Sequence, residues 1–361
     1  DYINDYKRNK LTNPKYCIVG DSSLFITYNG DILGCFQDFS GKCIVANIRN
    51  SNLKDIIKHK KDKVGRYEFC SNCNSNIAIL NRKNLRFFYI IKKNKIMNYQ
   101  LSVGFNGKKD TLLKIINSSN KVGDVYTGGL SGKIYGGRFQ YEDSYEKIKE
   151  NIEICHKHGI TLSITLNSPS GVPEKSDKIW WDDIANYLCE LESIGVDKVI
   201  CSHPFLISLA KEKTNLIVVA STIAEISNVR SALYYEELGA DIIVPSVSIN
   251  HDLKELILMK DNLQHATLKI LVNEVCLGNC PYRRFHHAHL SKANHRNYDI
   301  DYTSSCTKKY LDNPYLFLTN NVIRPEDLKL YEGICDNFKL VGRTIEDDIL
   351  VNMIKAYGNE Y

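Results

Sequence analysis

One short stretch of the chain concentrates residue types that can do chemistry. The apolar run Leu268–Val272 predicts a strand, and the polar pair Asn273 and Glu274 follows it directly. Cys276 and Cys280 come next, with three residues between them. Thiolates are soft ligands that suit zinc, copper and iron–sulfur clusters. The end of this strand is therefore a candidate metal or cluster site, with Glu274 as a candidate general acid or base beside it.

A basic helix is expected after the two cysteines. Pro281 predicts its start, because proline suits a first helical position. Arg283, His286 and His289 are spaced by three residues, so they would share roughly one face of that helix. Arginine binds anions and histidine exchanges protons near neutral pH, so these three residues and Glu274 are the candidate catalytic groups. The alternative is two free cysteines followed by a solvated basic helix.

The composition limits the class of protein. The chain has 361 residues, of which 43% are hydrophobic, enough for two or three domains with real cores. No apolar run approaches the roughly 18 residues that span a bilayer, and no signal peptide is visible, so we expect a cytoplasmic protein without a membrane partner. The formal charge of +5 permits an RNA or other anionic partner without requiring one.

Four of the 12 cysteines form a set in residues 1–80. Two β-type runs, Leu24–Thr27 and Ile32–Phe36, flank an Asn29–Gly30 pair, which is a strong hairpin signal. One cysteine precedes this hairpin, one ends its second strand, and a C-x-x-C pair follows. Without a secretion signal, such a set indicates structural zinc or an iron–sulfur cluster rather than disulfides. The four cysteines are Cys17, Cys35, Cys70 and Cys73.

The pattern of this N-terminal module resembles the Twitch or short SPASM auxiliary-cluster domain of radical SAM enzymes. The resemblance covers about residues 14–75 and rests on Cys17, Gly30, Cys35 five positions later, and the closing C-x-x-C. It implies a 4Fe–4S cluster on the four cysteines. The C-x-x-x-C-x-x-C signature of the radical SAM core is absent, because Arg283 stands where its third cysteine would be. A radical SAM barrel that precedes Asp1 in a longer polypeptide is a hypothesis.

A basic connector, residues 81–100, links this module to the rest of the chain. It mixes apolar residues with six lysines and arginines. A solvated helix or strand pair is the simplest interpretation of this mixture. Contact with a nucleic acid or another partner is the alternative.

Eight β-type runs recur through residues 101–361, with helical patterns between most of them. The runs are short and rich in Val and Ile, as strands buried on both faces are. They are Leu101–Phe105, Val122–Thr127, Thr161–Leu166, Lys198–Cys201, Leu216–Ala220, Asp241–Pro245, Leu268–Val272 and Asn337–Val341. Alternating strands and helices predict an α/β fold with a parallel sheet, and eight such units predict a (β/α)8 TIM-like barrel. A doubly wound sheet is the alternative.

In such a barrel, chemistry belongs at the C-terminal ends of the strands. Asn167, Asn273 and Arg343 follow directly on three of the runs or lie one residue further. Arg138 ends a glycine-rich loop after the second run, and Arg324 lies in the long excursion before the eighth. We expect these five residues to bind an anionic substrate, since amides and guanidinium groups donate hydrogen bonds to oxyanions.

The same topology predicts which cysteines of the barrel lie at its active face. Cys276 and Cys280 follow the seventh run, and Cys306 lies in the long excursion after it, so all three can reach the active face. Cys335 just precedes the eighth run and belongs near the opposite rim. Three cysteines indicate a 4Fe–4S cluster or a zinc ion with one further position, which a histidine of the basic helix or the substrate would fill.

The barrel segment resembles the collagenase-like peptidase U32 family. The resemblance spans roughly residues 101–345 and rests on N-E-x-C-x-x-x-C-P-x-R-x-x-H from Asn273 to His286, I-R-P-E-D from Ile323 to Asp327, and F-K-L-V-G-R from Phe338 to Arg343. It implies a barrel-like fold and a 4Fe–4S cluster on cysteines. Despite the family's name, related members are oxygen-independent hydroxylases of RNA bases or of ubiquinone precursors.

These observations favour an iron–sulfur redox enzyme with two clusters. One cluster would relay electrons from a donor, and the other would activate an RNA, peptide or small-metabolite substrate for hydroxylation or radical-type modification. A metal-dependent peptidase or hydrolase is the first alternative, although no H-E-x-x-H motif is present. A non-catalytic binding protein with structural metal is the second.

Overall fold

The computed structural model describes residues 25–26, 31–33, 44–47, 49–51, 56, 97–130, 136–138, 143–170, 178–293 and 303–359. The chain forms two compact units, residues 1–96 and 97–361. The predicted N-terminal cysteine set, Cys17, Cys35, Cys70 and Cys73, lies outside the described residues, as does the connector up to residue 96. The cluster assigned to these four cysteines therefore stays a prediction.

A small antiparallel sheet is described in the first unit. Its strands are β1 (Phe25–Ile26), β2 (Asp31–Leu33) and β3 (Ile44–Asn47), in the order β1-β2-β3. The β1–β2 pairing confirms the hairpin that Asn29–Gly30 predicted. The third strand was not predicted, and an Asn47 side chain that donates to Asp31 at 2.8 Å helps to hold it.

The second unit is built on a ring of parallel strands. Val- and Ile-rich runs form these strands because β-branched side chains pack well on a sheet covered on both faces. The strands are β4 (Gln100–Gly104), β5 (Val122–Thr127), β6 (Thr161–Leu166), β7 (Lys198–Cys201), β8 (Ile217–Ala220), β9 (Ile242–Ile243), β10 (Thr267–Leu268), β11 (Ile270–Leu271) and β12 (Asn337–Leu340). All eight predicted runs coincide with these strands.

The strand order closes the sheet into a barrel. The order is β10-β9-β8-β7-β6-β5-β4-β12-β11, and every pairing in it is parallel. β10 and β11 are consecutive halves of one stretch, interrupted at Lys269, and they pair with the two opposite edges of the sheet. If β10 and β11 are taken together as one strand, the barrel has eight strands, as the (β/α)8 prediction requires. The doubly wound alternative was wrong.

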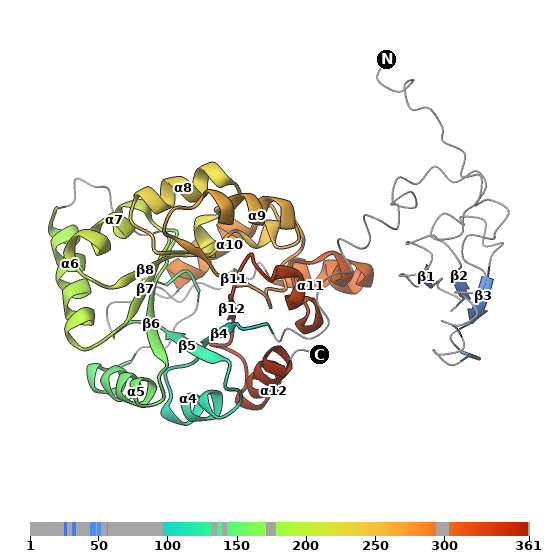
Figure 1. Ribbon diagram of the computed structural model, residues 1–361, viewed down its shortest axis with the longest axis horizontal. Coiled ribbons are helices and arrows are strands. Elements are labelled where there is room, and N and C mark those ends of the chain that lie inside the picture. Colours follow the sequence, from blue (N-terminus) through green and yellow to red (C-terminus); the bar gives the residue numbers. More distant parts are fainter. Residues whose placement is uncertain are drawn as a thin grey trace, which may run out of the picture. The chain divides into compact units, whose positions relative to one another are not determined.

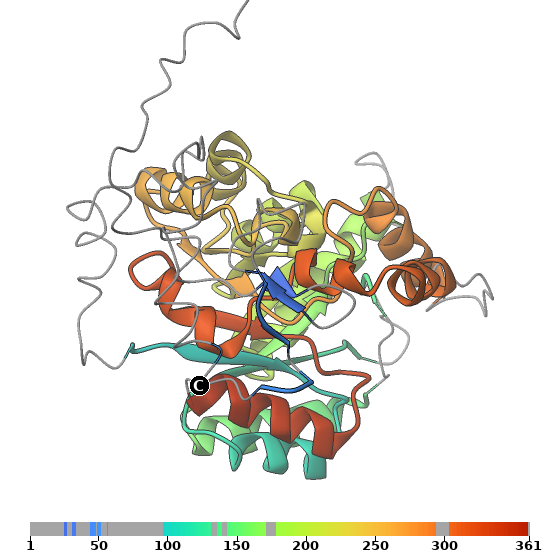
Figure 2. The same cartoon turned by 90° about the vertical axis from the view of Figure 1, so that its right-hand side faces the viewer.

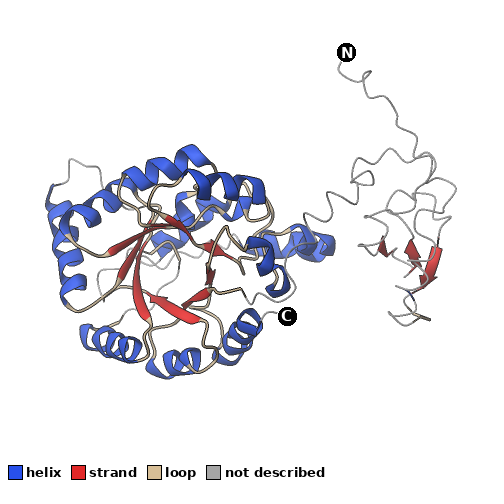
Figure 3. Ribbon diagram, viewed as in Figure 1, coloured by secondary structure: helices blue, strands red, loops and turns tan. Residues whose placement is uncertain are grey.

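The described helices mostly surround this ring of strands, although α10 overlaps the ring in this view (Figures 1 and 3). They are α4 (Lys109–Ile116), α5 (Tyr145–Lys157), α6 (Lys178–Ser193), α7 (Pro204–Lys213), α8 (Val229–Glu237), α9 (Leu253–Asn262), α10 (Arg283–Ala293), α11 (Thr303–Asp312) and α12 (Asp347–Asn359), with short 3-10 turns η2 (Thr222–Ala224), η3 (Val247–Ile249), η4 (Pro314–Thr319) and η5 (Pro325–Tyr331). The first and last barrel helices, α4 and α12, pack side by side, which joins the two ends of this unit (Figure 2).

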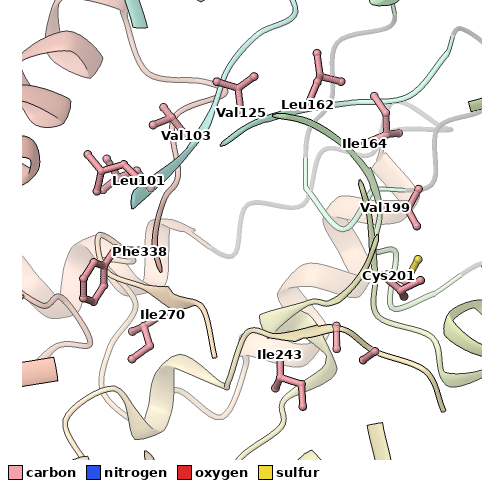
Figure 4. Packing of buried hydrophobic residues seen from close by; sticks show 14 of the residues in the cluster. Leu101, Val103, Val125, Leu162, Ile164, Val199, Cys201, Ile243, Ile270 and Phe338 are labelled. Atoms are coloured by element: carbon pink, nitrogen blue, oxygen red, sulfur yellow. The ribbon is translucent and has the colours of Figure 1, made fainter. Parts of the chain in front are cut away.

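The core lies mainly between the strands and the helices. Alternate strand residues such as Val103, Val125, Leu162 and Val199 are fully buried and point outward from the ring toward the helices (Figure 4). This follows from the period of two along a strand, which sends neighbouring side chains to opposite faces. Cys201 belongs to this outer layer, so its burial is structural.

Charged side chains fill the N-terminal part of the barrel interior. The carboxylate of Asp124 on β5 receives the Nζ of Lys198 at 3.2 Å and the Nζ of Lys269 at 3.0 Å. It also accepts hydrogen bonds from the hydroxyls of Ser102 and Ser163. Although burial alone would raise it, the two ammonium groups hold the pKa of Asp124 far below its ordinary value. This network is fully bonded and explains why β10 and β11 carry a buried lysine between them.

One helix boundary differs from its prediction. Pro281 and the residue after it form a turn, and α10 begins at Arg283. The turn follows Asn279, whose φ of 52° lies in the left-handed region. The first helical hydrogen bond runs from the N–H of His286 to the carbonyl oxygen of Tyr282 at 2.8 Å, so the helix starts two residues later than the proline indicated.

Candidate functional site

A cavity of about 420 Å³ lies in the excursion that links β11 to β12. This excursion contains α10, α11 and η4, and it leaves from the C-terminal end of its strand, which is the active end of such barrels. Residues from three separate parts of the excursion line the cavity. The lining residues are Glu274, Val275, Cys276, Leu277, Cys280, Arg283, His286, Cys306, Thr307, Tyr310, Leu311 and Phe317.

The cavity brings together the three cysteines that the topology selected. Cys276 and Cys280 come from the loop between β11 and α10, and Cys306 comes from α11. All three are half-buried. Cys335 is buried elsewhere, with its Sγ 3.2 Å from the carbonyl oxygen of Leu268, the last residue of β10 and the second of the stretch that β10 and β11 form. The prediction that Cys335 lies toward the opposite rim agrees with this position.

The donor set of the cavity fits an iron–sulfur cluster. Three thiols on the walls of one cavity are the soft ligands that such clusters use, and an open fourth position is common at reactive metal centres. Arginine side chains near the thiols would offset the negative charge of the thiolates. Among the described residues, no three His, Cys, Asp or Glu side chains converge closely enough to hold a single metal ion.

Two glutamates and two arginines form an ion-pair chain beside the thiols. Arg138 pairs with Glu274, and the Nη1 of Arg283 pairs with Glu225. The Nη2 of Arg283 lies 4.0 Å from Glu274. The side chain of Arg283 is only 7% exposed, so these charges interact through a medium of low polarity.

The arginines act on the cysteine nearest to them. Burial raises the pKa of the Cys276 thiol, while Arg283 and Arg138 oppose that rise. Burial and the charge of Arg283 lower the pKa of Arg138 to about 10, so its guanidinium is still cationic at neutral pH. The site therefore holds positive charge where a thiolate or another anion would be stabilised.

The cationic region continues into the barrel interior. Arg343 is buried and donates from its Nη1 to the hydroxyl of Thr165 at 3.1 Å. Its guanidinium lies 5.9 Å from the centre of the Tyr126 ring, and the Nζ of Lys339 lies 4.1 Å from the same ring centre. Burial, reinforced by Lys269 and Arg343, lowers the pKa of Lys339 well below its ordinary value.

Two of the predicted substrate-binding residues are already engaged in the scaffold. The amide of Asn167 accepts from the Gly137 backbone and donates to Ser221, each at 3.0 Å. A Cβ at Gly137 would stand 2.7 Å from the Asn167 carbonyl oxygen, so only glycine allows this approach. The amide of Asn273 bridges to both backbone groups of Val341. Both asparagines position loops at the barrel mouth.

The other predicted residues divide between the site and its surroundings. Arg138, Arg343, Arg283 and His286 lie at the mouth of the barrel or in the cavity wall. His289 is half-buried on α10 and does not line the cavity. The side chain of Arg324 is 66% exposed and pairs with Glu326 and Asp327 at the start of η5, so it is occupied outside the cavity.

Three further residues of the site were missed by the sequence analysis. Glu225 has a φ of 57°, a left-handed conformation that is costly for a side chain of its kind and typical of functional sites. His287 is 3% exposed, with its Nδ1 donating to the Gly137 carbonyl oxygen at 3.3 Å. Tyr310 lines the cavity and stacks on Phe317, with ring centres 4.2 Å apart. Each of them lies after a barrel strand or in the long segment between β11 and β12, and this position is the feature of the sequence that could have identified it.

A second cavity of about 600 Å³ shares two of the cysteines. It is lined by Leu277, Gly278, Asn279, Cys280, Pro281, Tyr282, Cys306, Lys309, Leu316 and Thr319. Cys280 and Cys306 therefore border both cavities. A group bound to these cysteines would be approachable from two sides.

The fold and the site together define an α/β-barrel protein with a cysteine-lined cavity at the C-terminal end of its seventh strand, which β10 and β11 form. Residues 113–360 match the model of Peptidase family U32, and the chain belongs to this family. Residues 17–74 match the SPASM iron–sulfur cluster-binding domain. Both resemblances found in the sequence are thereby confirmed. Among the described helices, none has the length and apolar character that crossing a bilayer requires.

Similar proteins carry names from the same family. The uncharacterized protease MJ1657 of Methanocaldococcus jannaschii is 31% identical over 278 residues, which are 72% of this chain and 82% of that protein. The solved structure of the U32 peptidase Mk0906 aligns with a TM-score of 0.53 at 15% identity, over 71% of this chain and 97% of that one. At this identity the structural match supports the fold alone.

Proposed function

We propose that this protein is an iron–sulfur redox enzyme whose reaction takes place at the C-terminal mouth of the barrel. Cys276, Cys280 and Cys306 would hold a 4Fe–4S cluster there, with one position left for a histidine or the substrate. The observation that supports this proposal is that three cysteines, from segments 26 positions apart, line one cavity together with Glu274, Arg283 and His286.

A bound cluster would supply one-electron chemistry and an open iron site. The protein's own residues have separate tasks around it. Arg138 and Arg283 would hold an anionic substrate, because guanidinium groups bind oxyanions with two parallel hydrogen bonds. Glu274, paired with Arg138 but only 10% exposed in its side chain, can take or give a proton at its carboxylate. His286 in the same wall is a second proton carrier.

The substrate class follows from the charge of the mouth. Three arginines, Arg138, Arg283 and Arg343, face two glutamates, Glu225 and Glu274. An anionic group on an RNA, a peptide or a small metabolite would balance this excess of positive charge. The N-terminal SPASM domain would relay electrons from a donor, and a cytoplasmic location would suit both clusters, since reducing conditions preserve thiolate ligands.

The first test is the metal content of the full chain purified without oxygen. Two clusters predict about eight irons and about eight sulfides per chain, with visible absorbance that bleaches on reduction. Replacing Cys276 with serine should remove about half of the iron, because one of the two clusters loses a ligand. Zinc without iron, in a colourless protein, would contradict the proposal.

A metal-dependent hydrolase is the second candidate. The names of the relatives favour it, as MJ1657 is called a protease and Mk0906 a peptidase. A single zinc ion would need the three cysteines to move closer together than they lie here; once bound, it could lower the pKa of a water, and Glu274 could accept the proton of that water. Zinc at about one per chain in the barrel, with peptidase activity that is lost on chelation and restored by zinc, would favour this candidate.

A further inference from the structure

Tyr310 places a buried phenol in the wall of the cysteine-lined cavity. It belongs to α11, and only 7% of its surface is exposed. Cys306 lies four residues earlier on the same helix, so the two side chains share a face. Cys276 and Cys280 line the same cavity from the loop before α10. The cavity therefore brings a phenol together with all three thiols.

The ring of Tyr310 is held in place by Phe317. The two rings are nearly parallel, with an angle of 21° between their planes and 4.2 Å between their centres. Phe317 belongs to η4, which packs against α11, and it lines the same cavity. A buried ring that stacks on a neighbour has few alternative positions, so the phenol has a fixed place in the wall.

The phenol is within electrostatic reach of the three thiols. Burial raises the pKa of Tyr310, and each of the three cavity cysteines raises it further. Charge interactions weaken with distance, so the phenol lies near all of these cysteines and not only near Cys306 on its own helix. Even at its ordinary pKa, a tyrosine is protonated at neutral pH. Tyr310 therefore enters the site with an O–H group that can donate.

The hydrogen of this phenol is not used by Asn320, the side chain that interacts with it. The hydrogen bond with Asn320 opposes the rise in the pKa of Tyr310, as a donor to the phenol oxygen does. The Oδ1 of Asn320 accepts from the backbone N–H of Val322 at 3.0 Å, which leaves its amide nitrogen as that donor. Apart from this interaction, the buried phenol oxygen has no hydrogen-bond partner among the described residues. The O–H hydrogen is available to an acceptor in the cavity.

We propose that Tyr310 tunes the barrel cluster, meaning the cluster on Cys276, Cys280 and Cys306, by donating a hydrogen bond from its phenol to a sulfur atom. Hydrogen bonds to the sulfurs of a cluster help to set its reduction potential. The reduced cluster carries one more negative charge than the oxidised cluster, so this bond is stronger in the reduced state. Tyr310 therefore raises the potential, while the phenol keeps its proton. This role rests on the proposed function, since it needs a cluster on these cysteines.

The test is a redox titration of the full chain purified without oxygen, with dithionite as the reductant and electron paramagnetic resonance as the readout. The barrel cluster is the signal that Cys276→Ser removes. Tyr310→Phe keeps the stacked ring and removes the hydroxyl. At a fixed potential, the ratio of reduced to oxidised barrel cluster should fall about tenfold, which equals a midpoint about 59 mV lower for a one-electron couple.

The matched control is the same substitution at a tyrosine outside the cavity. Tyr315 belongs to η4, is 63% exposed and lines neither of the two cavities. Tyr315→Phe should leave the midpoint of the barrel cluster unchanged. An equal shift in both variants would show that the effect does not come from a phenol beside the thiols.

A second variant changes the donor in the opposite direction. Tyr310→3-fluorotyrosine, introduced at this position alone, keeps the hydroxyl but makes it a stronger acid and a stronger donor. The midpoint should rise, whereas Tyr310→Phe lowers it. A role in packing alone predicts no such opposite shifts. This variant keeps every group of the residue, so it tests the proposal even where Tyr310→Phe does not fold.

Three results would overturn this inference, and iron and sulfide measured on the same samples tell them apart. An unchanged midpoint in both Tyr310 variants contradicts the hydrogen bond. Loss of the barrel iron from a folded Tyr310→Phe chain would make Tyr310 a ligand and not a donor. A barrel without iron in the unaltered chain contradicts the proposed function and removes this role with it, whereas a barrel cluster that does not respond to Tyr310 contradicts this role alone.

Discussion

The two ends of the barrel interior treat buried charge in opposite ways. Around Asp124, toward the N-terminal end, two lysines and several hydroxyls surround one carboxylate, and its oxygens are bonded at between 2.5 and 3.2 Å. At the C-terminal mouth, the buried Arg283 is shared between Glu225 and Cys276, and the buried His287 keeps one ring nitrogen without a hydrogen-bond partner. One network is complete, and the other has an open position.

This difference indicates a division of labour within one fold. A complete buried network holds neighbouring barrel strands together, and removing one of its charged side chains leaves the opposite charge unpaired. An incomplete one lowers stability unless a ligand completes it, so its persistence points to binding. In barrels of this type the N-terminal face serves stability and the C-terminal face serves chemistry, which matches the two networks.

The largest expected effect is on stability at the N-terminal end. Asp124→Asn should lower the free energy of unfolding by about 3–5 kcal/mol, because it leaves the ammonium groups of Lys198 and Lys269 buried without a counter-charge. Urea titration followed by circular dichroism measures this. The control is Glu150→Gln, which breaks an exposed pair with Lys109 and should cost less than about 1 kcal/mol. Similar losses for both variants would contradict the account.

The contribution of Asp124 should also appear in the pH dependence of the free energy of unfolding. Asp124 has a folded pKa below its ordinary value of 3.8, so the unfolded chain takes up this proton first as the pH falls. Its contribution is fully present at neutral pH and is lost progressively below about pH 4. Unfolding midpoints measured from pH 7 to pH 3 should fall more steeply in the unaltered chain than in Asp124→Asn. Parallel curves would show that this carboxylate is not the cause.

A smaller stability effect is expected at the mouth. Arg283→Met should change the free energy of unfolding by about 1 kcal/mol or less, because it removes a buried charge whose donors are only partly satisfied. Glu225 would keep its hydrogen bond from Ser246 and some exposure to water. The same urea titration applies. A loss as large as that of Asp124→Asn would mean that Arg283 is a structural residue.

The smallest effect should come from Cys335. Cys335→Ala should leave the iron content of the chain unchanged, since this thiol is buried beside Leu268 of β10 and does not line the cavity. Iron and sulfide assays of anaerobically purified protein measure this. Loss of about four irons would make Cys335 a ligand and would require a different arrangement of the excursion.

The strands could be predicted because their signal is local. Short runs of Val and Ile buried on both faces identified all eight barrel strands. The order of strands and loops along the sequence then predicted that Cys276, Cys280 and Cys306 lie at the same end of the barrel. Cys306 was found in this way although 26 positions separate it from Cys280. The prediction rested on topology, since the long segment after the seventh strand leaves from the C-terminal rim and its first part can stay beside that rim.

The residues that were missed depend on details of backbone geometry. The helix α10 begins two residues after Pro281, and its buried face carries Arg283 and His287, four residues apart, with His289 outside the cavity wall. Glu225 reaches Arg283 from its own left-handed position after η2. Helical spacing predicts which residues share a face, but it does not tell which face of the helix is turned toward the barrel.

The most direct test of the account asks whether the barrel alone binds a cluster. In a variant with Cys17, Cys35, Cys70 and Cys73 all replaced by serine, we predict about four irons per chain after anaerobic purification. Adding Cys276→Ser to this background should remove them, while adding Cys335→Ala should not. No iron in the fourfold variant, or iron that survives the loss of Cys276, would contradict the claim that the three cysteines at the mouth hold a cluster.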